Sequence, residues 1–232
     1  MRRAASYAVD RSALAATGGS FSTAAAPAQM GIPPGFPGYR DVHVYPLVPD
    51  LASARRLAGR GHRAAELYCI LEGGGPQAAQ IIKNNLAAIG IDVHVHCMPG
   101  DGFFTRMFRP NEPWDIAIDG YGATYNDPGE FINGLATDDE FNFSHYHDPR
   151  LSRAIRTAAG LSGIPRAQAY AKIDLALTRD TVPRINFANV IQQDFFSARI
   201  GCQLYQPMVG VDLGALCIRT GHDAIAPKSS VP

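Results

Sequence analysis

The chain has 232 residues, of which 46% are hydrophobic and 18% are charged. This composition is sufficient for a large buried core and excludes general disorder. Its 21 basic residues balance its 21 acidic residues, so no basic excess is available to bind nucleic acid by neutralising phosphates. No apolar run reaches the length of roughly 18 residues that a membrane-spanning helix needs.

The amino-terminal residues 2–15 predict an amphipathic helix, because small apolar residues recur there at helical spacing. Two arginines imitate the start of a signal peptide, but Asp10 and Arg11 interrupt the apolar region that such a peptide requires. We therefore expect no signal peptide in this chain, and the uncapped helix is typical of one cut from a longer segment. Residues 17–49 predict an irregular segment, and Asp50 predicts the cap of a short helix.

The clearest predicted unit follows. The segment 66–72 reads as a strand that ends in three glycines, and Pro76 then opens a helix with apolar residues on one face. A second strand is predicted over 91–97. Strand, helix and strand in this order predict a βαβ unit, so we expect the two strands to be parallel.

A short helix over 103–108 leads into a predicted strand over 114–118. That strand stops at a glycine-rich turn, after which Asn126, Asp127 and Pro128 predict the start of another helix. In open α/β sheets ligands bind beyond the carboxyl ends of strands, so this junction is the expected binding site. Three further elements are expected downstream, namely helices beginning at 149 and 165 and a strand over 184–191.

Three alternative site types were weighed against simpler interpretations. The glycines at 73–75 resemble a phosphate-binding turn, but their spacing is not G-x-G-x-x-G and a plain strand-to-helix turn is favoured. The repeated H-x-H spacing offers metal-ligand candidates, although nothing in the sequence brings the two pairs together and a polar surface is favoured. These candidates are His94, His96, His145 and His147. No nucleophile or paired carboxylate stands in a convincing setting, so we expect neither an enzyme nor a cofactor.

The four cysteines permit disulfides without requiring them. A bond between Cys69 and Cys97 is conceivable because both lie on strands of one βαβ unit. The sequence leaves open whether the two side chains point to the same face, so we do not expect this bond.

Six short motifs follow one another along most of the chain: RRAASYAVDRSAL, IPPGFPGY, PDLASARRLAGRG, AAQIIKNNLAAIGIDVHV, WDIAIDGYGATYNDPGEF and HYHDPRLSRAIRTA. In this order they resemble the carboxyl-terminal lobe of the family 5 extracytoplasmic solute-binding proteins of ABC importers. This is the dipeptide, oligopeptide and nickel group. The first motif resembles the family's R-x-A-x-x-Y-A-hydrophobic-D-R helix, and the fifth resembles its D-Y-x-D-P-x-x-F loop.

The resemblance implies an α/β fold of the periplasmic-binding-protein type II, with a mixed, mostly parallel sheet and helices on both faces. It implies that residues 1–196 form the second ligand-binding lobe. Residues 197–232 would form a tail that in full-length relatives crosses back to the first lobe. The implied function is capture of a small, peptide-like solute outside the membrane by lobe closure, and delivery to an importer permease.

The resemblance also implies which residues contact solute. The ligand-facing loop would comprise Tyr121, Gly122, Ala123, Thr124 and Tyr125, while Asn126 and Asp127 would order that loop. Peptide-binding relatives carry an acidic residue where this chain has Thr124, so the sequence predicts that the partner for a peptide amine is missing. Two alternatives stay open: a metal or metal-chelate binder that uses His145 and His147, and an interaction lobe without a transport role.

Overall fold

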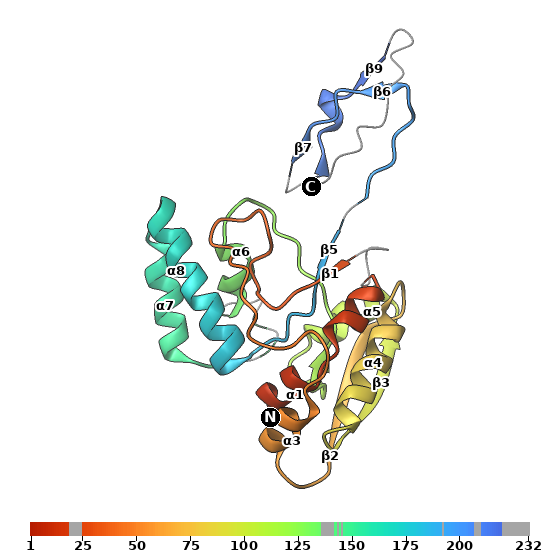
Figure 1. Cartoon of the computed structure of the whole chain (residues 1–232), viewed down its shortest axis with the longest axis vertical. Helices are drawn as coiled ribbons and strands as arrows, with labels where there is room; N and C mark the ends of the chain where they lie inside the picture. Colours follow the sequence, from red (N-terminus) through yellow and green to blue (C-terminus); the bar gives the residue numbers. More distant parts are fainter. Residues whose placement is uncertain are drawn as a thin grey trace. The chain divides into compact units, whose positions relative to one another are not determined.

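The computed structural model describes residues 1–18, 25–135, 142, 144, 146–191, 193–206 and 210–219. The chain divides into two compact units, residues 1–191 and 192–232. Each unit has its own elements, and the first contains the predicted βαβ unit (Figure 1).

The central sheet of the first unit has three parallel strands in the order β3-β2-β4. Strand β2 (Arg63–Ile70) pairs with β3 (Ile91–Met98) along its whole length and with β4 (Ile116–Ala117) over two residues. Helix α4 (Gly75–Ala87) connects β2 to β3 and lies along them (Figure 1). The predicted parallel βαβ unit is therefore confirmed, whereas β4 is shorter than the strand expected over 114–118.

Both faces of this sheet are covered by helices, as expected for the fold class. Alternate residues of β2, such as Leu67, pack in the larger core with α4, α1 (Arg2–Ala8) and α3 (Leu51–Ala58). The intervening residues Tyr68 and Ile70 contact Phe103 and Met107 of α5 (Gly100–Met107) on the opposite face. Helix α5 thus closes the face that α4 leaves open.

The expectation of one continuous helix over 2–15 is wrong. The structure has two helices there, α1 (Arg2–Ala8) and α2 (Arg11–Ala16), separated by an extended Val9. The carboxylate of Asp10 accepts a hydrogen bond from the Ala13 backbone N–H at 2.8 Å, so Asp10 starts the second helix as its cap. Asp50 caps α3 (Leu51–Ala58) in the same way, as predicted, through the Ser53 N–H at 3.0 Å.

Arg11 joins α2 to two distant segments. Its side chain is 1% exposed and donates to the carbonyl oxygens of Ser6 at 2.8 Å and Asn186 at 3.1 Å. The guanidinium carbon lies 5.2 Å from the centre of the Tyr45 ring. Burial lowers the pKa of Arg11 to about 10, so the side chain remains a cation at neutral pH.

The irregular segment before α3 is held in place by side-chain hydrogen bonds and by one short strand pair. Gln29 is buried, and its amide donates to the Tyr45 carbonyl oxygen at 2.6 Å and accepts from the Val44 and Tyr45 N–H groups at 2.7 Å each. Strand β1 (Ala25–Pro27) pairs antiparallel with β5 (Ala188–Val190). Of the strand expected over 184–191, only Ala188–Val190 pairs with another strand.

A second core lies beside the sheet region. Helix α6 (Gly129–Ile132) continues into a 3-10 turn, η1 (Asn133–Leu135). Helices α7 (Pro149–Ala159) and α8 (Gly163–Ala176) lie side by side (Figure 1), and a π-turn, η2 (Leu177–Thr181), follows α8. Their buried residues pack together, with Ile32 reaching in from the irregular segment: Phe131, Ile132, Ile155, Tyr170 and Ile173.

The cysteines of the βαβ unit form a disulfide. Cys69 of β2 and Cys97 of β3 are direct partners in the parallel register and have a Cα–Cα distance of 4.5 Å. Both side chains belong to the larger core and lie on the same face of the sheet, so the expectation that they form no bond is wrong. The strand register, which the sequence alone does not fix, places them on the same face.

The described residues of the second unit include two short antiparallel strand pairs. Strand β6 (Ile200–Gly201) pairs with β9 (Cys217–Ile218), and β7 (Tyr205–Gln206) pairs with β8 (Gly210–Val211). A 3-10 turn, η3 (Leu213–Ala215), lies between β8 and β9. A disulfide between Cys202 and Cys217 closes the first pair.

Candidate functional site

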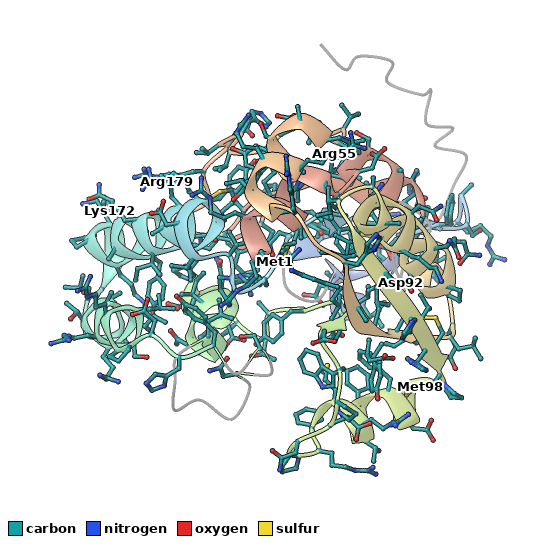
Figure 2. All side chains as sticks on the ribbon, turned by 90° about the horizontal axis from the view of Figure 1, so that it is seen from below. Met1, Arg55, Asp92, Met98, Lys172 and Arg179 are labelled. Atoms are coloured by element: carbon teal, nitrogen blue, oxygen red, sulfur yellow. A yellow bond between two sulfur atoms is a disulfide. The ribbon has the colours of Figure 1, made fainter. Side chains whose placement is uncertain are left out.

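The candidate site is the segment 119–128, called the ligand loop below. It follows β4 and the buried Ile118, and it leaves the sheet at the carboxyl end of the parallel strands. Figure 2 marks both ends of β3, with Asp92 at the amino end and Met98 at the carboxyl end. The structure therefore places the ligand loop where open α/β sheets bind ligands.

The two tyrosines of the ligand loop face solvent. Tyr121 is 58% exposed and Tyr125 is 55% exposed. Tyr121 also packs edge-on against Phe131, with ring centres 5.9 Å apart, while Ala123 is partly buried against the second core. The loop therefore exposes two aromatic side chains to solvent, while Ala123 holds it against the second core.

Thr124 contacts a carboxylate that the sequence analysis did not include. Its backbone N–H and its hydroxyl both donate to Oε2 of Glu130, at 2.8 Å and 2.6 Å. The hydroxyl of Tyr125 is also hydrogen-bonded to Glu130, and this bond raises the pKa of the tyrosine. An acidic group thus lies beside Thr124 although residue 124 is not itself acidic.

Asp127 forms a two-pronged ion pair with an arginine of α8. Its two carboxylate oxygens accept from Nη2 and Nε of Arg166 in α8, at 2.8 Å and 2.7 Å, and Oδ1 also accepts from the Gly129 N–H. Arg166 donates in addition to the carbonyl oxygens of Ala158 and Ala159. The Arg166 guanidinium lowers the pKa of Asp127. These contacts suit the predicted loop-ordering role of Asp127, whereas Asn126 is exposed.

Of the histidine candidates, His94 and His96 lie together on one strand. His94 and His96 are exposed on one face of β3, where Nδ1 of His94 and Nε2 of His96 lie 2.8 Å and 2.6 Å from the two carboxylate oxygens of Glu66. The hydrogen bond to Glu66 raises the pKa of His94. His147 is exposed and His145 lies outside the described residues. Within the described part of the chain, no three His, Cys, Asp or Glu side chains are arranged to hold a metal ion.

The glycine turn after β2 has a steric explanation. A Cβ atom at Gly75 would collide with the carbonyl oxygen of Ile70. Glycine therefore allows α4 to start directly against the end of β2, in agreement with the favoured interpretation as a plain strand-to-helix turn.

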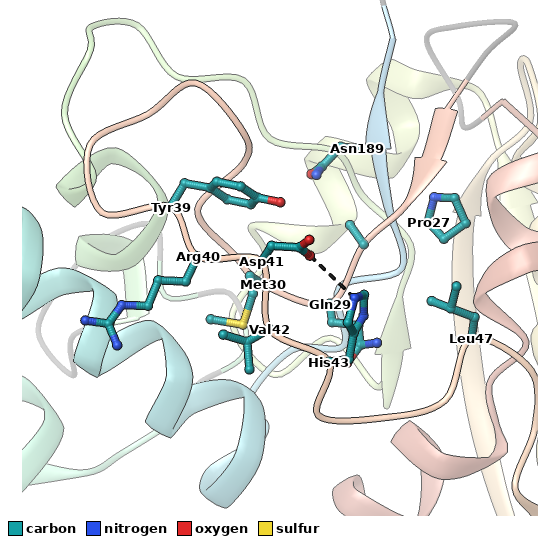
Figure 3. A pocket seen from close by; sticks show the side chains of 11 residues that line it. Pro27, Gln29, Met30, Tyr39, Arg40, Asp41, Val42, His43, Leu47 and Asn189 are labelled. Atoms are coloured by element: carbon teal, nitrogen blue, oxygen red, sulfur yellow. Dashed lines mark ion pairs between the residues drawn. The ribbon is translucent and has the colours of Figure 1, made fainter. Parts of the chain in front are cut away.

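One cavity of about 120 Å³ lies elsewhere, between the irregular segment and β5 (Figure 3). Its lining includes Tyr39, Asn189 and an exposed pair in which Nε2 of His43 is 3.5 Å from Oδ1 of Asp41. Small-molecule sites usually enclose roughly 300–1,000 Å³. This cavity is too small for a solute of peptide size, and we refer to it below as the Tyr39 cavity.

Two side chains of the loop region were missed by sequence reasoning. Arg166 is 39 residues from Asp127, so no local spacing connects them. Glu130 is within the predicted helix after Pro128 and carries no motif of its own. A carboxylate in the first turn of a helix is ordinarily explained by the helix dipole, which is why the sequence alone did not single it out.

None of the helices in the described part of the chain is both long and apolar enough to cross a membrane.

Sequence comparisons identify one family. The profile described as bacterial extracellular solute-binding proteins, family 5 middle, matches residues 1–143. The periplasmic oligopeptide-binding protein OppA of Salmonella typhimurium is 30% identical over 114 residues, which make up 48% of this chain and 20% of OppA.

Solved structures share the fold at low sequence identity. HbpA2 from Haemophilus parasuis has a TM-score of 0.78 at 19% identity, and the alignment covers 94% of this chain and 45% of HbpA2. DppA from Helicobacter pylori, solved with the peptide STSA, has a TM-score of 0.71 at 19% identity, covering 94% of this chain and 44% of DppA. The chain thus spans less than half the length of these proteins.

Proposed function

Because the chain belongs to the bacterial extracellular solute-binding proteins of family 5, we propose that it binds a small peptide-like solute outside the cell membrane. It would contribute one wall of a two-lobed cleft, and the captured solute would pass to the permease of an ABC importer. Lobe closure rather than chemistry is the proposed mechanism, driven by contacts that the solute makes only in the closed state.

The ligand loop is the observation that carries this proposal. It lies at the carboxyl end of the parallel sheet, exposes Tyr121 and Tyr125, and is held by Asp127 and Arg166. Rigid aromatic side chains with polar tips bind organic solutes at low cost in conformational entropy. The ligand-facing residues would be those named from the sequence, Tyr121 to Tyr125.

The two disulfides support an extracytoplasmic location. Cys69 pairs with Cys97 and Cys202 pairs with Cys217, which leaves no free cysteine. Disulfides of this structural kind persist in oxidising compartments and are rare in the reducing cytosol of mesophiles. The OppA relative is itself described as periplasmic.

The test is a titration of the isotope-labelled chain with alanine di-, tri- and tetrapeptides, followed by amide chemical shifts. We expect shifts at residues 121–125, and we expect Tyr121→Ala and Tyr125→Ala to weaken them. Tyr39→Ala, at the exposed tyrosine of the Tyr39 cavity, is the matched control and should leave them unchanged.

The affinity should be weaker than micromolar, because one wall of a cleft buries only part of a solute. Shifts confined to the Tyr39 cavity would contradict the assignment of the ligand loop. Submicromolar binding by this chain would contradict the idea that it provides only one wall.

A further inference from the structure

The outer surface of helices α7 and α8, which with the turn between them are called the α7–α8 hairpin below, is basic. Three exposed arginines follow one another on α7 at helical spacing, namely Arg150, Arg153 and Arg156. Lys172 is exposed on the outer side of α8 (Figure 2). The acidic residue within these helices is Asp174, which is 2% exposed. In a chain with a formal net charge of zero, this surface thus carries cations without an exposed carboxylate from either helix.

The arginines of α7 lie away from the face that packs in the protein. That inward face carries Leu151, Ile155 and Ala158, which belong to the second core. Residues three and four apart share one face of a helix, so the exposed arginines form a stripe along the other side. Uncharged substitutions in this stripe should therefore leave the packing of α7 intact.

The turn at the tip of the α7–α8 hairpin is apolar. Leu161 is 39% exposed and Ile164 is 74% exposed, and residues 158–165 include no charged side chain. Nη1 of Arg166 donates to two carbonyl oxygens at the end of α7, at 3.0 Å and 2.8 Å. These bonds hold the turn in shape, so the tip presents two apolar side chains to water at one end of the basic stripe.

A single exposed apolar residue is ordinary on a protein surface, but apolar side chains beside a basic stripe are typical of segments that bind a bilayer interface. Cations attract anionic headgroups within a Debye length, about 8 Å at physiological salt. Apolar side chains enter the boundary between headgroups and acyl chains. We propose that the α7–α8 hairpin, through Arg150, Arg153 and Ile164, docks on the surface of a bilayer that contains anionic phospholipid.

The apolar tip favours a bilayer over an acidic protein surface as the partner. An acidic protein surface would be bound by the arginines alone, whereas a bilayer also takes up the side chains of Leu161 and Ile164. Docking of this kind would keep the protein beside the membrane. It uses none of the residues of the ligand loop, so it stands or falls separately from the proposed binding of a solute.

The test is co-sedimentation of the full chain with vesicles of phosphatidylcholine, alone or mixed with an equal part of phosphatidylglycerol. We expect binding to the mixed vesicles only, and its loss at about 1 M salt, where the Debye length falls to about 3 Å. Each arginine near an anionic surface strengthens binding by about fivefold, so Arg150→Gln/Arg153→Gln should weaken it by roughly twentyfold. Ile164→Ser should weaken it by about fivefold, because the apolar contact is lost. The matched control is Arg60→Gln/Arg63→Gln, which removes two exposed arginines at the start of β2 and should bind like wild type.

Three outcomes would overturn this proposal. Absence of binding to the mixed vesicles at low salt excludes docking on anionic lipid. Equal weakening by the two double variants shows that total charge, and not the α7–α8 hairpin, is responsible. Unchanged vesicle binding by Ile164→Ser removes the bilayer assignment and indicates a partner that the arginines alone recognise, such as an acidic protein surface. Circular dichroism of each variant should match wild type, since all five substituted side chains are exposed.

Discussion

At the residue scale, the Asp127–Arg166 pair connects the ligand loop to α8. Its side chains are about 80% buried, with exposed fractions of 20% and 19%, and its two parallel hydrogen bonds give the bidentate geometry of a strong ion pair. Asp127 lies in the ligand loop and Arg166 lies in α8. The pair therefore fixes the position of the ligand loop relative to the helices of the second core.

Asp127→Asn tests the energetic weight of this pair. We expect it to lower the free energy of unfolding by roughly 1–3 kcal/mol at pH 7. The pKa of Asp127 is lowered in the folded protein, so its contribution is present above the unfolded pKa of about 3.9 and is lost as the pH falls through the lower folded value. Urea unfolding should therefore show wild type and variant converging in acid.

The matched control is Asp180→Asn. Asp180 pairs with Arg179 at 2.7 Å, but these side chains are 48% and 58% exposed, and exposed ion pairs contribute about 0–1 kcal/mol. This variant should differ from wild type by less than Asp127→Asn at pH 7. A difference between Asp127→Asn and wild type that persists unchanged at acidic pH would contradict the role assigned to the pair.

At the element scale, the Cys69–Cys97 disulfide joins the central strand β2 to the edge strand β3. The bond closes a loop with a sequence separation of 28 residues, and in the chain-entropy account this stabilises the fold by about 3–4 kcal/mol. We expect Cys69→Ala/Cys97→Ala to lose a large part of that amount in urea unfolding under non-reducing conditions. Cys202→Ala/Cys217→Ala, which removes the disulfide of the second unit, should leave the unfolding of the sheet unit near its wild-type midpoint.

A thiol count on the denatured, non-reduced chain checks the premise of this prediction. The structure has no free cysteine, so no thiol should react. If the cysteines at 69 and 97 react before reduction, the pairing of β2 and β3 through sulfur is wrong.

At the scale of the whole molecule, the second unit exposes apolar side chains that a folded protein usually covers. Leu213 is 77% exposed and Leu204 is 58% exposed, and other large apolar residues of this unit are also exposed. We propose that residues 197–232 pack against a first lobe, as a tail that crosses back from the second.

The substitutions Leu204→Ser and Leu213→Ser test this proposal. In this chain they should reduce the binding of a hydrophobic dye without lowering the free energy of unfolding, because the replaced side chains make little buried contact. In a longer form that contains a first lobe, the wild-type side chains should be shielded from the dye. Strong dye binding in that longer form would show that the first lobe does not cover them.

Sequence by itself determined the features that depend on residues close together in the chain. Hydrophobic periodicity and helix caps predicted the βαβ unit, the start of α3 at Asp50 and the position of the ligand loop, because these depend on neighbours within a few residues. The motif order also predicted the family.

Only the tertiary structure decided how side chains from separate elements meet. Strand register brought Cys69 and Cys97 together, and the packing of α8 against α6 brought Arg166 to Asp127. The folding of α6 turned Glu130 onto Thr124, which places a negative charge where the sequence predicted none. Such contacts depend on the relative placement of whole elements, and that placement is set by long-range packing of the cores rather than by the residues adjacent in the chain.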